Sequence, residues 1–168
     1  RQPPARGGVC MVLPEDVPRI VRDAARLARS GQLIVFGSAA YLQAPFTDDH
    51  EVWAQLLQET EIGMAGQSTV FGDAIGLAIS LFQASETDNR VLILLTDGAN
   101  TAGSVDPLKA ADLASNEGVR IYTIGVGSTQ QSVQIIEDGR LVVRDDLGMD
   151  EKVLRDIAGI TNGAYFRA

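Results

Sequence analysis

The sequence predicts a single α/β domain with a doubly wound, mainly parallel sheet and helices on both faces of that sheet. Residues 91–95 and 119–126 are short, strongly apolar runs, which is the pattern of strands buried on both sides. From residue 16 onwards, strand patterns alternate with amphipathic helix patterns, and most connections are short. Alternation of this kind is typical of βα units that build a parallel sheet.

Composition agrees with one globular domain. The chain has 168 residues, of which 45% are hydrophobic and 21% are charged. Such values are those of ordinary globular proteins, and the length suits one domain better than two. We therefore expect a single domain over residues 1–168. Residues 1–8 contain two prolines and two glycines and are expected to form an irregular lead-in.

Charge and side-chain inventory exclude several kinds of site. The formal net charge is −8 and the sequence has no basic cluster, so binding to a nucleic-acid backbone is not expected. Cys10 is the single cysteine and His50 the single histidine. An intrachain disulfide, a zinc site and a Ser-His or Cys-His triad are therefore not expected. An acidic chain fits a divalent cation or a basic partner surface better.

The first elements are a weak strand, a helix and a strong strand. Val9–Leu13 is a short apolar run that fits a strand. Asp16, with Pro18 in the first turn, begins a helix that Gly31 ends. Gln32–Phe36 follows as a strand. The apolar stripe of the helix consists of Val17, Ile20, Val21, Ala24, Leu27 and Ala28.

A loop, a helix and a second loop follow. Residues 37–47 are expected to be a loop, and the Asp48-to-Glu51 spacing predicts a capping box for the next helix. That helix is expected to turn Val52, Trp53, Leu56 and Leu57 inward. Residues 63–73 form a loop rich in small and hydroxyl residues. It leads into a helix with Ile75, Ala78, Ile79 and Phe82 on one face.

The second half of the chain holds two capped helices and a hairpin. Asp106 with Pro107 begins a helix that ends at Gly118, and Asp150 caps the last helix. Residues 133–136 and 141–143 flank the turn signal Asp138-Gly139, which predicts a β-hairpin insertion near 133–143. Asn162-Gly163 ends the last helix before a final strand at 164–166. The inward residues are expected to be Leu108, Ala111, Ala114, Val153, Leu154, Ile157 and Ala158.

Asp97 is the first candidate for chemistry. It comes directly after the buried strand 91–95 and Thr96, and ligands in open α/β sheets bind at the carboxyl ends of the strands. Thr69 lies in a loop that opens on the same edge, so its hydroxyl can converge with the Asp97 carboxylate. Hard oxygen donors with water in the other positions suit Mg²⁺. The alternative is that Asp97 and Gly98 only form a turn.

Three enzyme interpretations fit the motifs poorly. A phosphate-binding Gly-x-x-x-x-Gly-Lys-Ser/Thr loop does not occur. Gly125 and Gly127 follow a strand, but Gln130 stands where a dinucleotide fingerprint has its third glycine. Asp97 could act as the nucleophile of a phosphohydrolase, although Ala99 replaces the second carboxylate that such enzymes carry. This phosphohydrolase is kept as the alternative function.

Five stretches of the sequence resemble the von Willebrand factor A (VWA) domain, and more narrowly its Bat-type (aerotolerance) branch, which occurs in bacterial membrane proteins. The stretches follow one another in the family's order and cover nearly everything after residue 32. They are 33–47 (LIVFGSAAYLQAPFT), 66–76 (GQSTVFGDAIG), 94–103 (LLTDGANTAG), 121–127 (IYTIGVG) and 162–168 (NGAYFRA).

The resemblance implies a Rossmann-like VWA fold with a metal-ion-dependent adhesion site (MIDAS) at the carboxyl edge of the sheet. Thr69 matches the threonine of the second ligand loop, and Asp97 matches the aspartate of the third. Gly98 matches the glycine that follows this aspartate. The implied ion is Mg²⁺, or Mn²⁺ or Ca²⁺ in its place. No catalytic residue is implied.

The first ligand loop of the family has no counterpart in this sequence. The family carries Asp-x-Ser-x-Ser after its first, central strand, and this triplet is absent here; residues 7–14 read GGVCMVLP at the corresponding place. We therefore expect the first central strand to be missing or replaced, and Mg²⁺ to bind weakly at best. Either Val9–Leu13 fills the central position, or a neighbouring chain supplies a strand in a swapped homodimer.

The resemblance leads us to expect a non-enzymatic protein–protein interaction module with an incomplete MIDAS. Its setting is expected to be a bacterial membrane-associated stress-tolerance assembly linked to a MoxR-type ATPase, with a partner that donates a carboxylate to the metal. The domain is expected to be soluble, because no apolar run approaches the roughly 20 residues that span a bilayer. We expect it to be a piece of a longer protein anchored in the inner membrane, on the periplasmic side.

Overall fold

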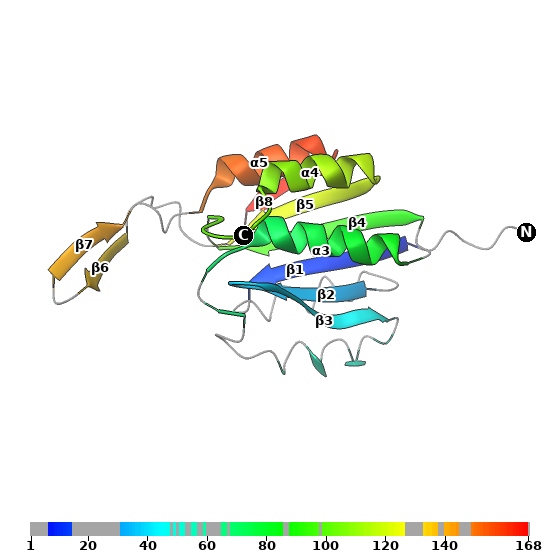
Figure 1. Ribbon diagram of the computed structural model, residues 1–168, viewed down its shortest axis with the longest axis horizontal. Helices are drawn as coiled ribbons and strands as arrows, with labels where there is room; N and C mark the ends of the chain where they lie inside the picture. The colour runs from blue at the N-terminus through cyan, green and yellow to red at the C-terminus, as the bar shows by residue number, and fades with distance from the viewer. Residues whose placement is uncertain are drawn as a thin grey trace, which may run out of the picture.

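The computed structural model describes most of the chain (Figure 1). The described residues are 7–14, 31–47, 49, 51–52, 55–56, 59, 65–66, 68–85, 88–97, 99–126, 133–137, 140–144 and 149–167. The helix expected from Asp16 to Gly31 falls outside them except for Gly31, as do Trp53 and Leu57. Within the described residues, no helix combines the length and the apolar character that crossing a bilayer requires.

The main sheet has six strands in the order β3-β2-β1-β4-β5-β8. All neighbouring pairs are parallel except β2 with β3, so the predicted mainly parallel sheet is confirmed. The strands are β1 (Gly7–Pro14), β2 (Gly31–Phe36), β3 (Ala40–Thr47), β4 (Asn89–Thr96), β5 (Val119–Gly125) and β8 (Tyr165–Arg167).

β1 lies at the centre of this sheet. It pairs in parallel with β2 on one side, with Val12 beside Ile34, and with β4 on the other, with Val12 beside Leu94. The strand predicted at Val9–Leu13 therefore exists, and it starts two residues earlier, at Gly7 within the expected lead-in. Val9–Leu13 thus fills the central position of the sheet, as the first of the two expectations has it.

Three helices pack on one face of the sheet (Figure 1). They are α3 (Phe71–Gln83), α4 (Pro107–Asn116) and α5 (Glu151–Ile160). The predicted inward stripe of α3 is confirmed, because all four of its residues are buried against the core. β4 supplies the sheet side of this core through Leu92 and Leu94, which are both 0% exposed. The main members from the helices are Ile75, Ala78, Ile79, Phe82, Ala111, Ala114, Leu154 and Ile157.

The predicted caps of α4 and α5 are confirmed. The Asp106 carboxylate accepts hydrogen bonds from the amides of Leu108 and Lys109. The Asp150 carboxylate accepts one from the amide of Val153, at 3.1 Å. Both contacts satisfy amides that have no partner within the helix, which is why the sequence signal was strong.

The prediction of a loop at 37–47 is wrong for most of that range. Residues Ala40–Thr47 form β3, an antiparallel edge strand beside β2. The register shifts twice between Gly31 and Ile34, and the exposed Pro45 lies within the strand. Irregular edge strands tolerate proline and lack strict alternation, so their sequence resembles a loop.

The helix start expected at Asp48 is also displaced. The Asp49 carboxylate accepts hydrogen bonds from the amides of Glu51 and Val52, at 3.0 and 3.1 Å. Asp49 therefore takes the capping role predicted for its neighbour. Val52 was expected to face inward, but it is 46% exposed. Leu56 is half-buried.

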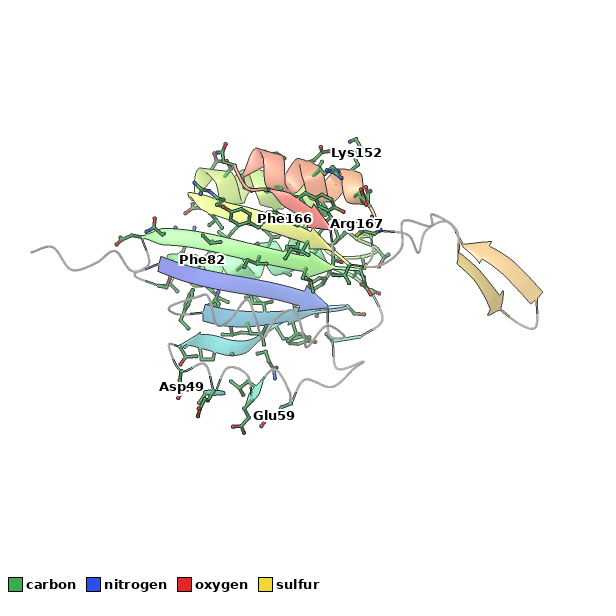
Figure 2. All side chains as sticks on the ribbon, turned by 180° about the vertical axis from the view of Figure 1, so that it is seen from behind. Asp49, Glu59, Phe82, Lys152, Phe166 and Arg167 are labelled. Carbon is green, nitrogen blue, oxygen red and sulfur yellow. The ribbon has the colours of Figure 1, made fainter. Side chains whose placement is uncertain are left out.

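The predicted hairpin is confirmed. β6 (Val133–Glu137) and β7 (Arg140–Arg144) pair antiparallel, with Glu137 beside Arg140. This pairing leaves a two-residue connection, as expected for Asp-Gly between two strands. The hairpin forms a separate two-stranded sheet and stands away from the main sheet in both views (Figures 1 and 2).

The turn between α5 and β8 packs closely against β5, and this close approach can be tested directly. Gly163 donates to the carbonyl of Ala158 at 2.8 Å, and a Cβ added to it would overlap the backbone carbonyl of Ile121. By contrast, a Cβ on Gly159 in α5 would meet nothing within 4 Å. We expect Gly163→Ala to lower the free energy of unfolding by about 2 kcal/mol or more.

The matched control is Gly159→Ala, which should be neutral or stabilise the helix by roughly 0.5–1 kcal/mol. Urea unfolding monitored by circular dichroism measures both values. Equal effects of the two substitutions would contradict the close approach of this turn to β5.

Candidate functional site

The carboxyl ends of β1, β2 and β4 meet at one edge of the sheet, because these strands are parallel. β1 ends at Pro14, which lies beside Phe36 at the end of β2. β4 ends at Thr96, which is 0% exposed and whose carbonyl accepts a hydrogen bond from the amide of Val126 at 2.9 Å. Asp97 follows at once and is exposed. The edge is therefore where the chain passes from the core to the surface.

Thr69 lies in the loop before α3 and is tied to the loop after β4. Its amide donates to the hydroxyl oxygen of Thr101 at 3.0 Å, and its carbonyl accepts from the amide of Thr101 at 3.0 Å. Thr101 is four residues beyond Asp97. These reciprocal bonds bring the loops of the two predicted ligands together. The Thr69 hydroxyl itself makes no hydrogen bond to any residue that the structure describes.

The loop before α3 is also fixed on its other side, against the end of β2. The Ser38 amide donates to the carbonyl of Ala65 at 2.6 Å, and the Ser38 hydroxyl oxygen accepts from the amide of Ser68 at 3.2 Å. Gly66 lies between them with a φ of +92°, a conformation that glycine adopts without strain. The end of β2 and the loop before α3 are thus joined by two hydrogen bonds.

Asp73 holds the far part of the loop after β4. It lies in the first turn of α3, and its carboxylate accepts hydrogen bonds from the amides of Ser104 at 3.0 Å and Val105 at 2.7 Å. Gly103 packs against this carboxylate with a φ of +110°. Asn100 adds a bond from its side-chain amide to the carbonyl of Ala102, at 2.8 Å.

Sequence reasoning missed Asp73 and Asn100. Asp73 and Ser104 are 31 residues apart in the chain, so no local spacing connects them. The available signal was an acidic residue in the first turn of a helix, and that signal is usually explained by the helix dipole alone. The contact instead makes Asp73 a positioning residue for the loop that follows Asp97.

The donor types at this edge fit a hard divalent cation. A threonine hydroxyl and a carboxylate are oxygen ligands, and Mg²⁺ accepts few protein oxygens with water in its other positions. Among the described residues, no group of three or more His, Cys, Asp or Glu could hold a metal. Of the two residues that the sequence predicts as ligands, Thr69 offers a hydroxyl oxygen and Asp97 a carboxylate. Residues 15–30, which follow β1, lie outside the described part of the chain.

Residues 19–168 match the von Willebrand factor type A domain. The chain belongs to this family. An uncharacterized protein of Borreliella burgdorferi is 30% identical over 137 residues, which are 80% of this chain and 40% of that protein. The chain therefore spans less than half the length of this relative.

Solved structures of VWA domains share the fold. An aerotolerance-related membrane protein from Bacteroides fragilis has a TM-score of 0.81 at 24% identity, covering 96% of this chain and 91% of that chain. BatB from Bacteroides thetaiotaomicron has a TM-score of 0.79 at 24% identity, covering 96% and 90%. The expected VWA fold is confirmed, and these proteins carry the Bat and aerotolerance names that the sequence resemblance predicts.

A more distant structural neighbour holds zinc at a MIDAS motif of its own chain. Proximal thread matrix protein 1 of the mussel byssus, with a zinc-occupied MIDAS motif, has a TM-score of 0.72 at 20% identity. The match covers 97% of this chain and 41% of that chain. Divalent metal binding is thus a property of some VWA domains with this fold.

Removing the Asp73 carboxylate should loosen the loop after β4. We expect Asp73→Ala to lower the free energy of unfolding by about 1–2 kcal/mol, because two loop amides lose their acceptor. Amide hydrogen exchange at Ser104 and Val105 should accelerate more than exchange in β4. Asp112→Ala is the control, since Asp112 is an exposed carboxylate on α4. Unchanged exchange at Ser104 and Val105 would rule out this role of Asp73.

Proposed function

We propose that this chain is a non-enzymatic protein-interaction module whose docking point is the edge that carries Asp97 and Thr69. The observation that supports it most directly is the reciprocal hydrogen bonding of Thr69 with Thr101, at 3.0 Å in both directions. These two bonds hold the backbone of the loop before α3 against the loop after β4. A docking point held in this way loses little conformational entropy when a partner binds.

In this proposal a divalent cation, Mg²⁺ or in its place Mn²⁺ or Ca²⁺, binds to the Thr69 hydroxyl and the Asp97 carboxylate. The site is incomplete, because the sequence lacks the Asp-x-Ser-x-Ser triplet that supplies the other protein oxygens in the family. Water fills the remaining positions, and affinity for the ion alone is weak. A carboxylate from the partner protein then completes the coordination, so that partner and ion bind together.

The proposed setting is a Bat-type assembly in a bacterial membrane that works with a MoxR-type ATPase in stress tolerance. The matched stretches of sequence support this, together with the fold shared with the Bacteroides aerotolerance-related protein and BatB. We place the parent protein in the inner membrane with this domain on the periplasmic side. This chain spans 40% of its Borreliella relative. The statements about assembly and location are therefore proposals about the whole protein.

A strand-swapped homodimer is the proposed alternative to a monomer. Exchange of β1 between two copies would keep the observed pairing of β1 with β2 and β4. Size-exclusion chromatography with light scattering distinguishes the two forms, and a strict monomer at high concentration would eliminate the exchange.

The phosphohydrolase alternative requires a second carboxylate next to Asp97. Position 99, where such enzymes carry it, is Ala99. Turnover of p-nitrophenyl phosphate at millimolar Mg²⁺ that disappears in Asp97→Asn would establish the enzyme. We expect no turnover by either protein.

Calorimetric titration with MgCl₂ and MnCl₂ tests the metal site. We expect a dissociation constant in the millimolar range, about 10⁻³ M, as for weak carboxylate sites. Asp97→Ala should abolish binding because the charged ligand is lost, and Thr69→Ala should weaken it. Asp112→Ala removes an exposed carboxylate elsewhere and should leave binding unchanged.

Absence of binding to the wild-type chain would refute the metal site. Equal binding by Asp97→Ala would place the ion elsewhere. Far-UV circular dichroism of each variant establishes that a loss of binding is not a loss of fold.

A further inference from the structure

Asn162 is followed directly by Gly163, a pair of residues that is chemically labile. The sequence contains four asparagines, and after the other three, Asn89, Asn100 and Asn116, the next residue carries a side chain. An asparagine loses its amide nitrogen when the backbone nitrogen of the next residue attacks the side-chain carbonyl carbon. Glycine hinders this attack least because it lacks a Cβ. The sequence therefore has a single Asn-Gly bond, between α5 and β8.

The backbone at this pair forms a Schellman turn that ends α5. Asn162 has a φ of +55° and is exposed. Its amide donates to the carbonyl of Gly159 at 3.4 Å, and the amide of Gly163 donates to the carbonyl of Ala158 at 2.8 Å. These are the two hydrogen bonds of the motif. The side chain that would react is therefore accessible to water, whereas the nitrogen that would attack it is held in a hydrogen bond.

The residues on both sides of Asn162 contact the backbone of Ile121 in β5. Thr161 is 3% exposed, and its hydroxyl oxygen accepts a hydrogen bond from the amide of Ile121 at 3.0 Å. Gly163 approaches the carbonyl of Ile121 so closely that an added Cβ would overlap it. Attack requires the Gly163 nitrogen to lose its proton and turn towards the Asn162 side chain. The hydrogen bond of Gly163 and its packing against Ile121 must therefore break first.

We propose that Asn162 is a deamidation site which this turn protects, and that it reacts when the turn alone opens, without unfolding of the domain. In the opened turn the Gly163 nitrogen bonds to Cγ of Asn162 and the Cγ–Nδ2 bond breaks. Nδ2 leaves as ammonia, together with the proton that Gly163 gives up. Water then opens the cyclic imide at either carbonyl, which leaves aspartate or isoaspartate at position 162. This proposal does not rest on the proposed function.

Isoaspartate at position 162 would prevent the turn from closing again. Its backbone runs through the side-chain carbonyl and is longer by a carbon atom. The carbonyl of Ala164 accepts a hydrogen bond from the amide of Thr123 at 3.1 Å, and Tyr165 lies beside Thr123 in the register of β5 and β8. An additional backbone atom moves both residues out of this register. Conversion to isoaspartate therefore makes a transient opening permanent.

Ageing of the full chain in mildly alkaline buffer tests the proposal. Mass spectrometry of the proteolytic peptide that contains position 162 measures the deamidated fraction over time, since oxygen replaces NH. The references are the same chain in concentrated urea and the synthetic peptide acetyl-Gly-Ile-Thr-Asn-Gly-Ala-Tyr-amide. We expect the folded chain to react at least about tenfold more slowly than either reference, because only molecules with an open turn react.

Two substitutions distinguish opening of the turn from unfolding of the domain. Thr161→Val keeps the shape of the side chain but removes the hydroxyl that binds Ile121. We expect it to accelerate deamidation of the folded chain about fivefold or more, since a buried hydrogen bond is lost. Asp106→Ala removes the cap of α4 and lowers stability away from the turn. It should leave the rate at Asn162 unchanged.

The isoaspartate product provides a second readout. After its separation by ion exchange, the amide of Thr123 should exchange with deuterium faster than in the unaged chain, because its acceptor on Ala164 is displaced. Unchanged exchange at Thr123 would contradict the loss of β8 pairing.

Equal rates of deamidation in the folded chain and in urea would overturn the proposal. This comparison requires no variant, so it decides the matter even if Thr161→Val fails to fold. Equal acceleration by Thr161→Val and Asp106→Ala would also overturn it, because both would then act through unfolding of the whole domain.

Discussion

The structure depends on the pairing of β1 with β2 on one side and β4 on the other. A central strand has no solvent on either edge, so every amide and carbonyl along it must find a partner in the neighbouring strands. Without β1, two strand edges would be left unpaired in the middle of the sheet. The register of Val12 beside Ile34 and Leu94 also sets β2 and β4 at the same level. The loops that follow these strands consequently begin at one edge.

That edge is built by contacts between loops. The Thr69 loop is bound by Ser38 from the end of β2 and by Thr101 from the loop after β4. Asp73 binds the same β4 loop further along, through Ser104 and Val105. Each contact satisfies backbone amides that a surface loop would otherwise leave to water. The loops are therefore held by these contacts, and the proposed metal ligands Thr69 and Asp97 need contribute little to holding them.

In the proposed function, the Asp97 edge offers oxygen donors to a cation and, through it, to a partner carboxylate. Figure 2 shows Arg167 at the end of β8 and Phe166 on the sheet face opposite α3, α4 and α5.

Features that depend on neighbours in the sequence were predicted well. Asp106 and Asp150 cap their helices through amides two or three residues away, and the Glu137–Arg140 turn joins adjacent strands. β3 was missed because its irregular pairing with β2 removes the alternation that identifies a strand. Asp73 was missed because its partners are 31 and 32 residues distant. Pairing across such distances is decided by the sheet order, which local patterns do not contain.

The central strand also explains why the fold does not require the Asp-x-Ser-x-Ser triplet. Backbone pairing requires an extended segment of suitable length and does not require the Asp-x-Ser-x-Ser triplet after it. GGVCMVLP provides that segment. The absence of the triplet from this sequence is therefore compatible with an intact sheet.

Hydrogen–deuterium exchange followed residue by residue tests the position of β1 most directly. The account predicts that the amides of Val9 to Leu13 exchange as slowly as those of Val91 to Leu95, because both sets lie in strands paired on two sides. Rapid exchange at Val9 to Leu13, with slow exchange maintained in Val91 to Leu95, would contradict it.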